Sequence, residues 1–487
     1  MSYLSKAIIT ALFLTYTLII VLLFKYLGHD FVTLSSLSKT DFFSMVIFLL
    51  VTTISLININ YFAFFLPFML LSMPTAIDNF SPQILVSSSY DFSKTYLSTL
   101  SRIDIFLIVG TIRYLNPRYF QINKYYLILF SLIVLLFVST MVSFINETDA
   151  HSRLIVITQS YHFRYLSLLM LLSLNTSILG KDMYLLYGII FSLIFIVAES
   201  FLSTHILQYS RLTSGSLGNN SYANILAAFY GFYVIKFRKN KLSIAFHLIS
   251  VIFLFLIFKT QTRSAFFLYV LVTYLNLIHS FFSVPVIKRK YIIILSFLFS
   301  SIFFTIINES SRYNFFDSKE IKIDINKSRL NQKFNLDQTK FNESLIMRLN
   351  HFQTSLNMIK SNPITGIGAG MWNYKKTQFG SEDKRFLDSH NDFLSAVSQY
   401  GLLTGFVLCI LIYFLPIILK IQSRNLNLKN TSLKDLYVFS VFSFFVGITN
   451  SGIFKYSIFS FMSLVLMIYV YRTNNTKAID ENSNLRH

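Results

Sequence analysis

Residues 125–146 read YYLILFSLIVLLFVSTMVSFIN, a run without a charged side chain. The hydrocarbon core of a bilayer is about 30 Å thick, and roughly 20 residues of α-helix cross it. Because hydrocarbon offers the backbone no hydrogen-bond partners, a single segment of this length crosses as a helix. The run therefore predicts a transmembrane helix.

Similar apolar runs recur along most of the chain. They lie near 7–28, 42–58, 61–73, 97–115, 125–146, 161–180, 183–203, 221–237, 242–259, 264–283, 291–308, 393–419, 434–450 and 456–472. Several are short, and 61–73 fits a re-entrant or half-length segment as well as a full span. We therefore expect an all-α polytopic membrane protein with about 12–14 transmembrane helices, whose boundaries are set within a few residues.

The composition agrees with this class of protein. Of 487 residues, 54% are hydrophobic and 13% are charged, whereas a soluble domain has about a quarter charged residues. The formal net charge of +20 is compatible with nucleic-acid binding, but the positive residues collect in short connecting loops, as in membrane proteins. We therefore expect membrane lipids and no nucleic acid as partners. The single cysteine, Cys409, excludes an intramolecular disulfide.

The basic loops predict which connections share a side of the membrane. Three short loops rich in lysine and arginine, at 236–241, 288–290 and 420–434, are assigned to the cytoplasm by the positive-inside rule. Counting spans outward from them places 204–220 and 259–263 on the external side. The long insertion after residue 308 is external too, because long loops cross the membrane largely regardless of charge.

This sidedness gives the organisation of the chain. We expect a transmembrane bundle over 1–308, one large external loop over 309–389, C-terminal transmembrane helices over 390–472 and a cytoplasmic tail over 473–487. The N-terminus is expected in the cytoplasm. The apolar run after Lys6 lacks a small-residue cleavage site, so it is interpreted as a retained span.

Two arginines on the external side are candidate oxyanion ligands. Arg263 opens a predicted span, and its guanidinium offers forked donors suited to phosphate oxygens. An arginine at the end of a span can equally extend to lipid headgroups. Arg211 lies among serine and threonine hydroxyls beside Gly215, which suits an oxyanion but is also ordinary loop composition. Both interpretations stay open for each residue.

His390 is the candidate general base. It lies in DSHNDFLSAVSQYGLLTG (388–405), where Asp388 or Ser389 is expected to cap a helix that has His390 in its first turn. At helical spacing His390 would share a face with Leu394, so the imidazole would point into the bundle. A histidine near an external vestibule can accept a proton, or it can be a satisfied interfacial side chain.

The stretch before His390 combines an amphipathic helix with a glycine-rich turn. Met347–Lys360 is predicted to lie as a helix across the outer surface until Pro363 ends it. The GIGAG run at 366–370 has glycines at dinucleotide-motif spacing, but no strand precedes it and no parallel sheet is available. We interpret these glycines as tight turns that return the chain to His390.

Together these motifs resemble one superfamily of membrane enzymes. SNPITGIGAGMWNY (361–374) followed by SHNDFLSAVSQYGLLTG (389–405) resembles the turn, His-Asn-x-x-Leu and Gly-Leu-x-Gly signature of the O-antigen ligase and O-antigen polymerase superfamily. SRLTSGSLGNNSYANILA (210–227) and TQTRSAFF (260–267) resemble its two arginine segments. The likeness covers roughly residues 205–410 and fits the superfamily rather than one member.

The resemblance implies a fold and an activity. The fold is a bundle of transmembrane helices with one large periplasmic loop, related to the GT-C glycosyltransferases. The activity is an inverting, metal-independent transfer of a glycan from undecaprenyl diphosphate to an acceptor hydroxyl, at the periplasmic face of a bacterial inner membrane. No cofactor is implied. The residues agree about metals, since no ligand-spaced group exists beyond Asp388 and Asp392.

The family's functional residues map onto matching positions of this sequence. The resemblance implies that Arg211 and Arg263 bind the diphosphate and that His390 activates the acceptor. Asn391 is a candidate substrate contact that, with its neighbour Asp392, holds the site at the membrane surface. Arg348 stands where the family often has a basic residue and is a further candidate contact. The polar piece 313–344 matches no family motif and is either an acceptor-recognition module or a flexible excursion.

Several functions remain open. The turn and the His-Asn motif look closest to the ligase branch, so lipid A-core is the favoured acceptor. The alternatives are a polysaccharide polymerase with a glycan acceptor and a protein O-oligosaccharyltransferase. A flippase for the same lipid-linked glycan is less favoured, because transporters carry internal repeats and midplane ionisable groups. Here the ionisable residues cluster at the outer ends of the predicted spans.

Overall fold

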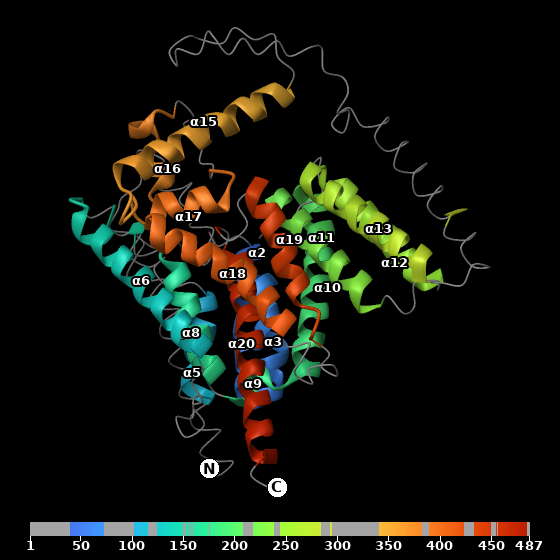
Figure 1. Ribbon diagram of the computed structural model, residues 1–487. Helices are drawn as coiled ribbons and strands as arrows, with labels where there is room; N and C mark the ends of the chain where they lie inside the picture. The colour runs from blue at the N-terminus through green and yellow to red at the C-terminus, as the bar shows by residue number, and fades with distance from the viewer. Residues whose placement is uncertain are drawn as a thin grey trace.

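Helices form all the regular secondary structure in the part of the chain that the computed structural model describes (Figure 1). The described residues are 39–72, 102–114, 124–149, 152–153, 155–156, 159–174, 176–207, 218–237, 244–283, 293–294, 340–381, 389–422, 433–449, 454 and 456–484. The predicted runs 7–28 and 291–308 lie outside these residues, apart from 293–294. The protein is an all-α polytopic membrane protein, as its apolar runs predict.

The helices of the first half follow the predicted runs closely. They are α2 (Lys39–Ile57), α3 (Ile59–Ser72), α5 (Arg102–Tyr114), α6 (Lys124–Asn146), α8 (Tyr161–Leu174), α9 (Thr176–Leu179) and α10 (Asp182–Leu207). The short helix α3 is buried and packs along α10. A Cβ atom on Gly188 would overlap the Phe64 carbonyl oxygen, so the missing side chain allows this close approach.

The helices of the second half include the external segment. They are α11 (Gly218–Lys236), α12 (Ile244–Thr260), α13 (Arg263–Ser283), α15 (Lys340–Ser361), α16 (Trp372–Lys375), the 3₁₀ helix η6 (Lys376–Phe379), α17 (Asp392–Tyr400), α18 (Leu402–Gln422), α19 (Tyr437–Thr449) and α20 (Tyr456–Asn484). The predicted amphipathic helix at Met347–Lys360 is confirmed and forms most of α15. It ends at Ser361, before Pro363.

Three of the described helices are long and apolar enough to cross a membrane. They are α6, α18 and the Arg263–Phe282 part of α13. Shorter apolar stretches lie at Ile47–Ile57, Ile59–Leu71, Asp182–Ala198, Phe246–Thr260, Tyr437–Ile448 and Ile458–Thr473. The total of about 12–14 spans stays a prediction.

Exposed apolar side chains mark the surface of the bundle that suits lipid. On α6, Leu127, Phe130 and Phe137 are exposed, while Leu129 and Leu136 on the other side of the helix are buried. Lipid is as apolar as the core, so such exposure carries no penalty in a bilayer. The interior is continuous around the central helices α3 and α20, which contact each other.

The predicted span 393–419 is two helices, not one. α17 ends at Tyr400 and α18 begins at Leu402, because Gly401 has φ 85° and ψ 166°, outside the helical region. A Cβ atom at Gly401 would overlap the carbonyl oxygen of Ile364 in the preceding turn, so only glycine fits there. α17 packs against α15 and belongs with the external segment, and the membrane helix begins at Leu402.

Contacts between distant helices identify one end of the bundle, which we call the inner end. Arg472, in the second half of α20, donates a hydrogen bond of 2.6 Å to Asp182 at the start of α10. Lys236, which ends α11, lies within electrostatic range of Asp435, just before α19. Lys236 and Asp435 lie in or beside loops that the positive-inside rule assigns to the cytoplasm, and Arg472 directly precedes the predicted cytoplasmic tail.

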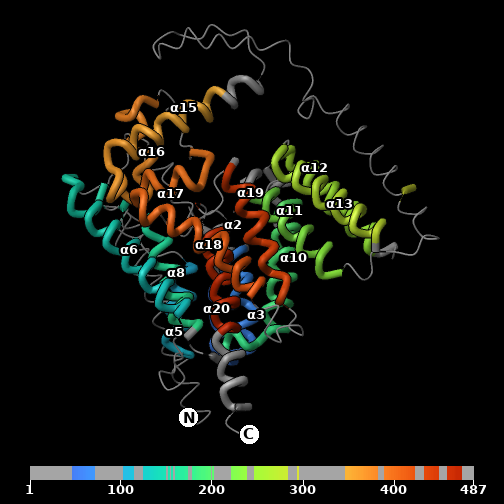
Figure 2. Tube along the Cα trace, viewed as in Figure 1, coloured from blue at the N-terminus to red at the C-terminus, as the bar shows by residue number. Residues whose placement is uncertain are grey.

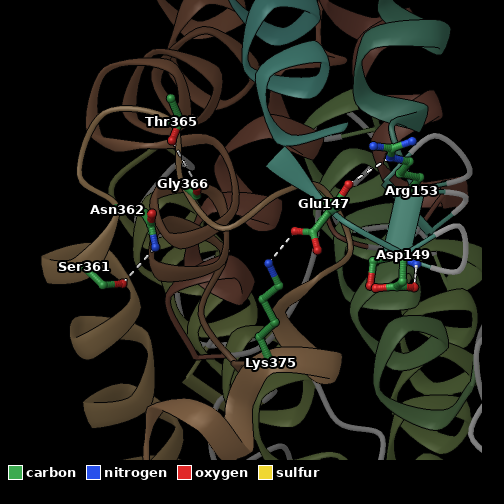
Figure 3. A network of polar contacts seen from close by, with 9 residues as sticks. Glu147, Asp149, Arg153, Ser361, Asn362, Thr365, Gly366 and Lys375 are labelled. Atoms are coloured by element: carbon green, nitrogen blue, oxygen red, sulfur yellow. Dashed lines mark hydrogen bonds and ion pairs between the residues drawn. The ribbon is translucent and has the colours of Figure 1, made fainter. Parts of the chain in front are cut away.

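The opposite end, which we call the outer end, carries the external segment. Figure 2 shows α15, α16 and α17 together there, away from the C-terminal end of α20. Lys375 of α16 forms an ion pair with Glu147, which directly follows α6 (Figure 3). Arg153 donates a hydrogen bond of 2.8 Å to the Glu147 carbonyl. The grouping of loops at the two ends agrees with the predicted sidedness; which end faces a periplasm stays a prediction.

Candidate active site

The glycine-rich turn after α15 is bound to α17 through its backbone. Gly366, Gly368 and Gly370 have φ angles of 69°, 106° and 73°, a region that glycine enters without steric cost. The Gly368 amide donates to the Gln399 carbonyl at 3.1 Å, and the Gly370 amide donates to Gln399 Oε1 at 2.6 Å. The interpretation of this run as tight turns that return the chain toward His390 is confirmed.

The expected cap of α17 is wrong, and so is the expected place of His390. The N-cap is Asn391, not Asp388 or Ser389, and its Oδ1 accepts the Leu394 amide at 3.0 Å. His390 therefore precedes the helix, with φ 55°. The predicted shared helical face with Leu394 does not exist, and the direction of the imidazole is set by the loop and its neighbours instead.

The two residues after His390 fix its loop to the membrane helices. Asn391 Nδ2 donates to the Ile448 carbonyl of α19 at 2.9 Å. Asp392 is fully buried and accepts a short hydrogen bond from Tyr413 of α18, with Gly447 of α19 against its carboxylate. These contacts suit the expectation that Asn391 and Asp392 hold the site in place. A direct contact between Asn391 and substrate stays a prediction.

An aromatic neighbour of His390 is a second histidine that the sequence analysis does not identify. The ring of His351 on α15 is fully buried and stacks on the His390 ring, with centroids 5.8 Å apart and planes 13° apart. Trp372 packs edge-on against His351 at 5.0 Å. The only sequence signal was the position of His351 on the inward face of a predicted amphipathic helix.

Two arginines from different elements lie within electrostatic range of each other at the outer end. Arg263 begins α13, and Arg348 lies on α15. Burial lowers the pKa of Arg348 below its ordinary value, and the nearby positive charge of Arg263 lowers it further. The first turn of α13 is tied to α11 because Ser264 Oγ donates to Asn224 Oδ1 at 3.4 Å.

Helix α15 joins these two groups into one site. Arg348 and His351 are three residues apart on this helix, so their Cβ atoms are about 5–6 Å apart. Arg348 lies within electrostatic range of Arg263, and His351 stacks on His390. The structure therefore brings together three of the predicted site residues, Arg263, Arg348 and His390. Arg211 lies outside the described residues.

A small polar cavity lies next to the His390 loop. It has a volume of about 50 Å³, and its lining includes Trp372, Asn373, Ser389, Ser395 and Gln399. This volume holds one or two water molecules rather than a sugar ring. Among the described residues, no group of three or more His, Cys, Asp or Glu side chains is placed to hold a metal ion, and the metal-free mechanism stays a prediction.

Comparison with protein families gives one match. The model of a family described as O-antigen ligase matches residues 248–409, a region that contains Arg263, Arg348 and His390. A search of curated proteins found no match. The matched region runs from α12 through α15 and α17 into α18, whereas α11 and α19, which contact the site, lie outside it. The match covers about a third of the chain and agrees with the resemblance of its motifs to the O-antigen ligase and polymerase superfamily.

Proposed function

We propose that the protein transfers a glycan from undecaprenyl diphosphate to an acceptor hydroxyl at the periplasmic face of the inner membrane. The observation that carries this proposal is that Arg263 and Arg348 lie within electrostatic range of each other at the outer end. Two guanidinium groups repel one another, and a diphosphate bound between them relieves that repulsion. Because Arg263 begins a membrane helix, the bound phosphates lie where the head of a lipid carrier lies.

His390 acts on the acceptor in this proposal. The acceptor hydroxyl gives its proton to a His390 nitrogen while its oxygen forms a bond to the anomeric carbon of the glycan. The bond from that carbon to the phosphate oxygen breaks, and undecaprenyl diphosphate leaves with the electron pair. A single displacement of this kind inverts the anomeric carbon.

The arginines and the histidine have different roles in the proposed reaction. The arginines stabilise the negative charge that develops on the leaving diphosphate, so departure needs no proton. A general base with a pKa near neutral contributes about 10²–10⁴-fold to the rate. His390 belongs to a loop fixed by Asn391 and Asp392, and the arginines belong to α13 and α15. The site therefore has separate elements for the donor and the acceptor.

The first experiment measures transfer by the purified protein in lipid nanodiscs. The donors are the same glycan linked to undecaprenyl diphosphate and, as the matched control, to undecaprenyl monophosphate. We expect transfer to lipid A-core from the diphosphate only, because in the proposed site each of the two phosphates is bound by one of the two arginines. Equal use of both donors would contradict the role of the arginine pair. No transfer from either donor to any hydroxyl acceptor would contradict the proposed function.

The same assay separates the acceptors. Lipid A-core is favoured because the matching family is described as O-antigen ligase. A product with two joined repeat units on the carrier would identify a polymerase, and a glycosylated protein would identify a protein O-oligosaccharyltransferase. In a flippase, a His390→Ala variant would stop the glycan from reaching the outer leaflet; in a transferase, it leaves the glycan there and blocks its transfer.

A further inference from the structure

The side chain of His390 is held by a column of rings that begins on a different element. His390 stacks on His351, and His351 meets Trp372 edge-on. The Trp372 indole nitrogen donates to Ser355 Oγ at 2.9 Å, and Ser355 Oγ donates to the His351 carbonyl at 2.9 Å. The Trp372 indole is therefore hydrogen-bonded to α15 itself, at Ser355, one turn after His351.

The backbone of His390 does not fix its own ring. A positive φ is uncommon for residues other than glycine, and this one lies in a loop ahead of the helix N-cap. Neither a helical repeat nor a strand pleat directs the imidazole. The fully buried His351 ring packs against the face of the imidazole and therefore contributes to its orientation.

We propose that His351 is a positioning residue that holds the His390 imidazole in the orientation needed to accept the acceptor's proton. This inference rests on the proposed function. The centroid distance of 5.8 Å and the angle of 13° describe an offset stack of two rings, the arrangement that planar π systems favour. A base must be aligned with the proton that it removes, and a misplacement of about 1 Å can cost about 10²-fold in rate.

Helix α15 carries both His351, which positions His390, and Arg348, which belongs to the donor side of the site. Arg348 lies one turn before His351 on α15 and approaches Arg263. A shift of α15 moves both the stacking ring and the second arginine. The acceptor base is therefore aligned by the element that also contacts the donor side.

The test compares two substitutions of His351 with a matched control. His351→Phe keeps a planar ring of similar size in the stack, whereas His351→Ala removes the ring. Thr354→Ala changes an equally buried residue of α15 whose hydroxyl contacts Asn350 on the same helix. All three are purified as full-length protein in nanodiscs, and kcat and KM are measured for transfer.

We expect His351→Ala to lower kcat by about 10–100-fold with little change in the KM of the donor, because alignment and not binding is lost. His351→Phe should keep most of the wild-type kcat, and so should Thr354→Ala. Two results would overturn the proposal. One is a wild-type kcat for His351→Ala; the other is a His351→Phe variant as slow as His351→Ala, which would mean that the ring face is not what matters.

A second readout does not depend on activity. Diethyl pyrocarbonate acylates imidazole nitrogens, and the Nε2 atom of His390 is buried in the structure. Mass spectrometry gives the rate of modification at His390, which should rise severalfold in His351→Ala and stay unchanged in His351→Phe and Thr354→Ala. An unchanged rate in His351→Ala would overturn the positioning role. Absence of transfer by the wild-type protein would instead count against the proposed function, since the modification rates are measured without substrate.

Discussion

The two arginines of the candidate site carry the same charge, unlike the opposite charges paired at the inner end and in the Lys375–Glu147 ion pair at the outer end. At the inner end, Arg472 is paired with Asp182 at 2.6 Å, and Lys236 lies near Asp435. At the outer end, the charge that acts on Arg348 is that of another cation, Arg263. Opposite charges that satisfy each other join helices, whereas like charges held close together favour an anion between them.

This difference distinguishes charged residues that stabilise the fold from those that are candidates for binding substrate. The inner contacts join α10 to α20 and the end of α11 to the loop before α19, so they cross-link helices that are distant in sequence. The outer arginines lie on α13 and α15 and carry charges of the same sign. We therefore expect substitutions at the outer end to change transfer and those at the inner end to change stability.

The largest effect is expected at His390. His390→Ala removes the proposed base and should lower the rate of glycan transfer by about 10²–10⁴-fold. The control is His279→Ala, an exposed histidine far along α13 from Arg263, which should transfer normally. The measurement is product formed per minute from the lipid-linked donor at saturating acceptor. A His390→Ala variant with the wild-type rate would contradict the role of His390 as the general base.

The fold could be predicted from the sequence because its signal is local. Nearly every described helix outside the segment 340–379 coincides with an apolar run. The exception is informative. Gly401 divides a continuous apolar run through its φ of 85° and its close approach to Ile364. Both features belong to the tertiary structure, so a hydropathy pattern does not reveal them.

The site could be predicted only in part. Arg263 and His390 were identified by residue type and motif, and Arg348 by its position in the chain. His351 was missed because a histidine on a buried helix face resembles any satisfied core residue, and only the fold places it on His390. The cap was assigned wrongly because Asp388, Ser389 and Asn391 are all good N-cap residues, and long-range contacts selected Asn391.

The second prediction concerns the geometry of the outer charge pair. Arg263→Lys and Arg348→Lys keep the charge but lose the forked donor, so each should lower transfer by about 10–100-fold, the rate equivalent of about 1.5–3 kcal/mol for a charged hydrogen bond. The control is Arg153→Lys, an exposed arginine at the same end that contacts the Glu147 carbonyl, and it should change transfer less than twofold.

Inhibition by inorganic pyrophosphate gives a second test of the arginine pair. If the arginines bind phosphate, inorganic pyrophosphate should inhibit the wild-type protein and should inhibit both lysine variants more weakly. Near wild-type transfer by Arg263→Lys would contradict the phosphate role of that residue. An equal loss in Arg153→Lys would show that the assay reports general damage to the outer end.

The third prediction is for the inner end, where the effect should be on stability. Removing one partner of a fully buried ion pair costs about 3–5 kcal/mol. Because 27% of the Asp182 side chain is exposed, we expect about 1–3 kcal/mol for Arg472→Gln or Asp182→Asn alone. The double variant should be less destabilised than the sum of the two, since the remaining charge is gone. Thermal unfolding in detergent measures this, and additive losses would contradict a direct pair.

The smallest expected effect is that of chelation. In the proposed mechanism the charge on the leaving diphosphate is stabilised by Arg263 and Arg348, which cannot be removed by a chelator. Transfer by the wild-type protein should therefore be unchanged by EDTA. The informative comparison is the Arg348→Lys variant, in which the loss of the forked donors leaves phosphate oxygens free for a divalent ion to bind. If magnesium restores transfer to this variant and has no effect on the wild type, the arginine pair does the work that a metal does in other phosphate chemistry. Loss of wild-type transfer on EDTA, restored by magnesium or zinc, would instead show that the two like charges at the outer end are not sufficient.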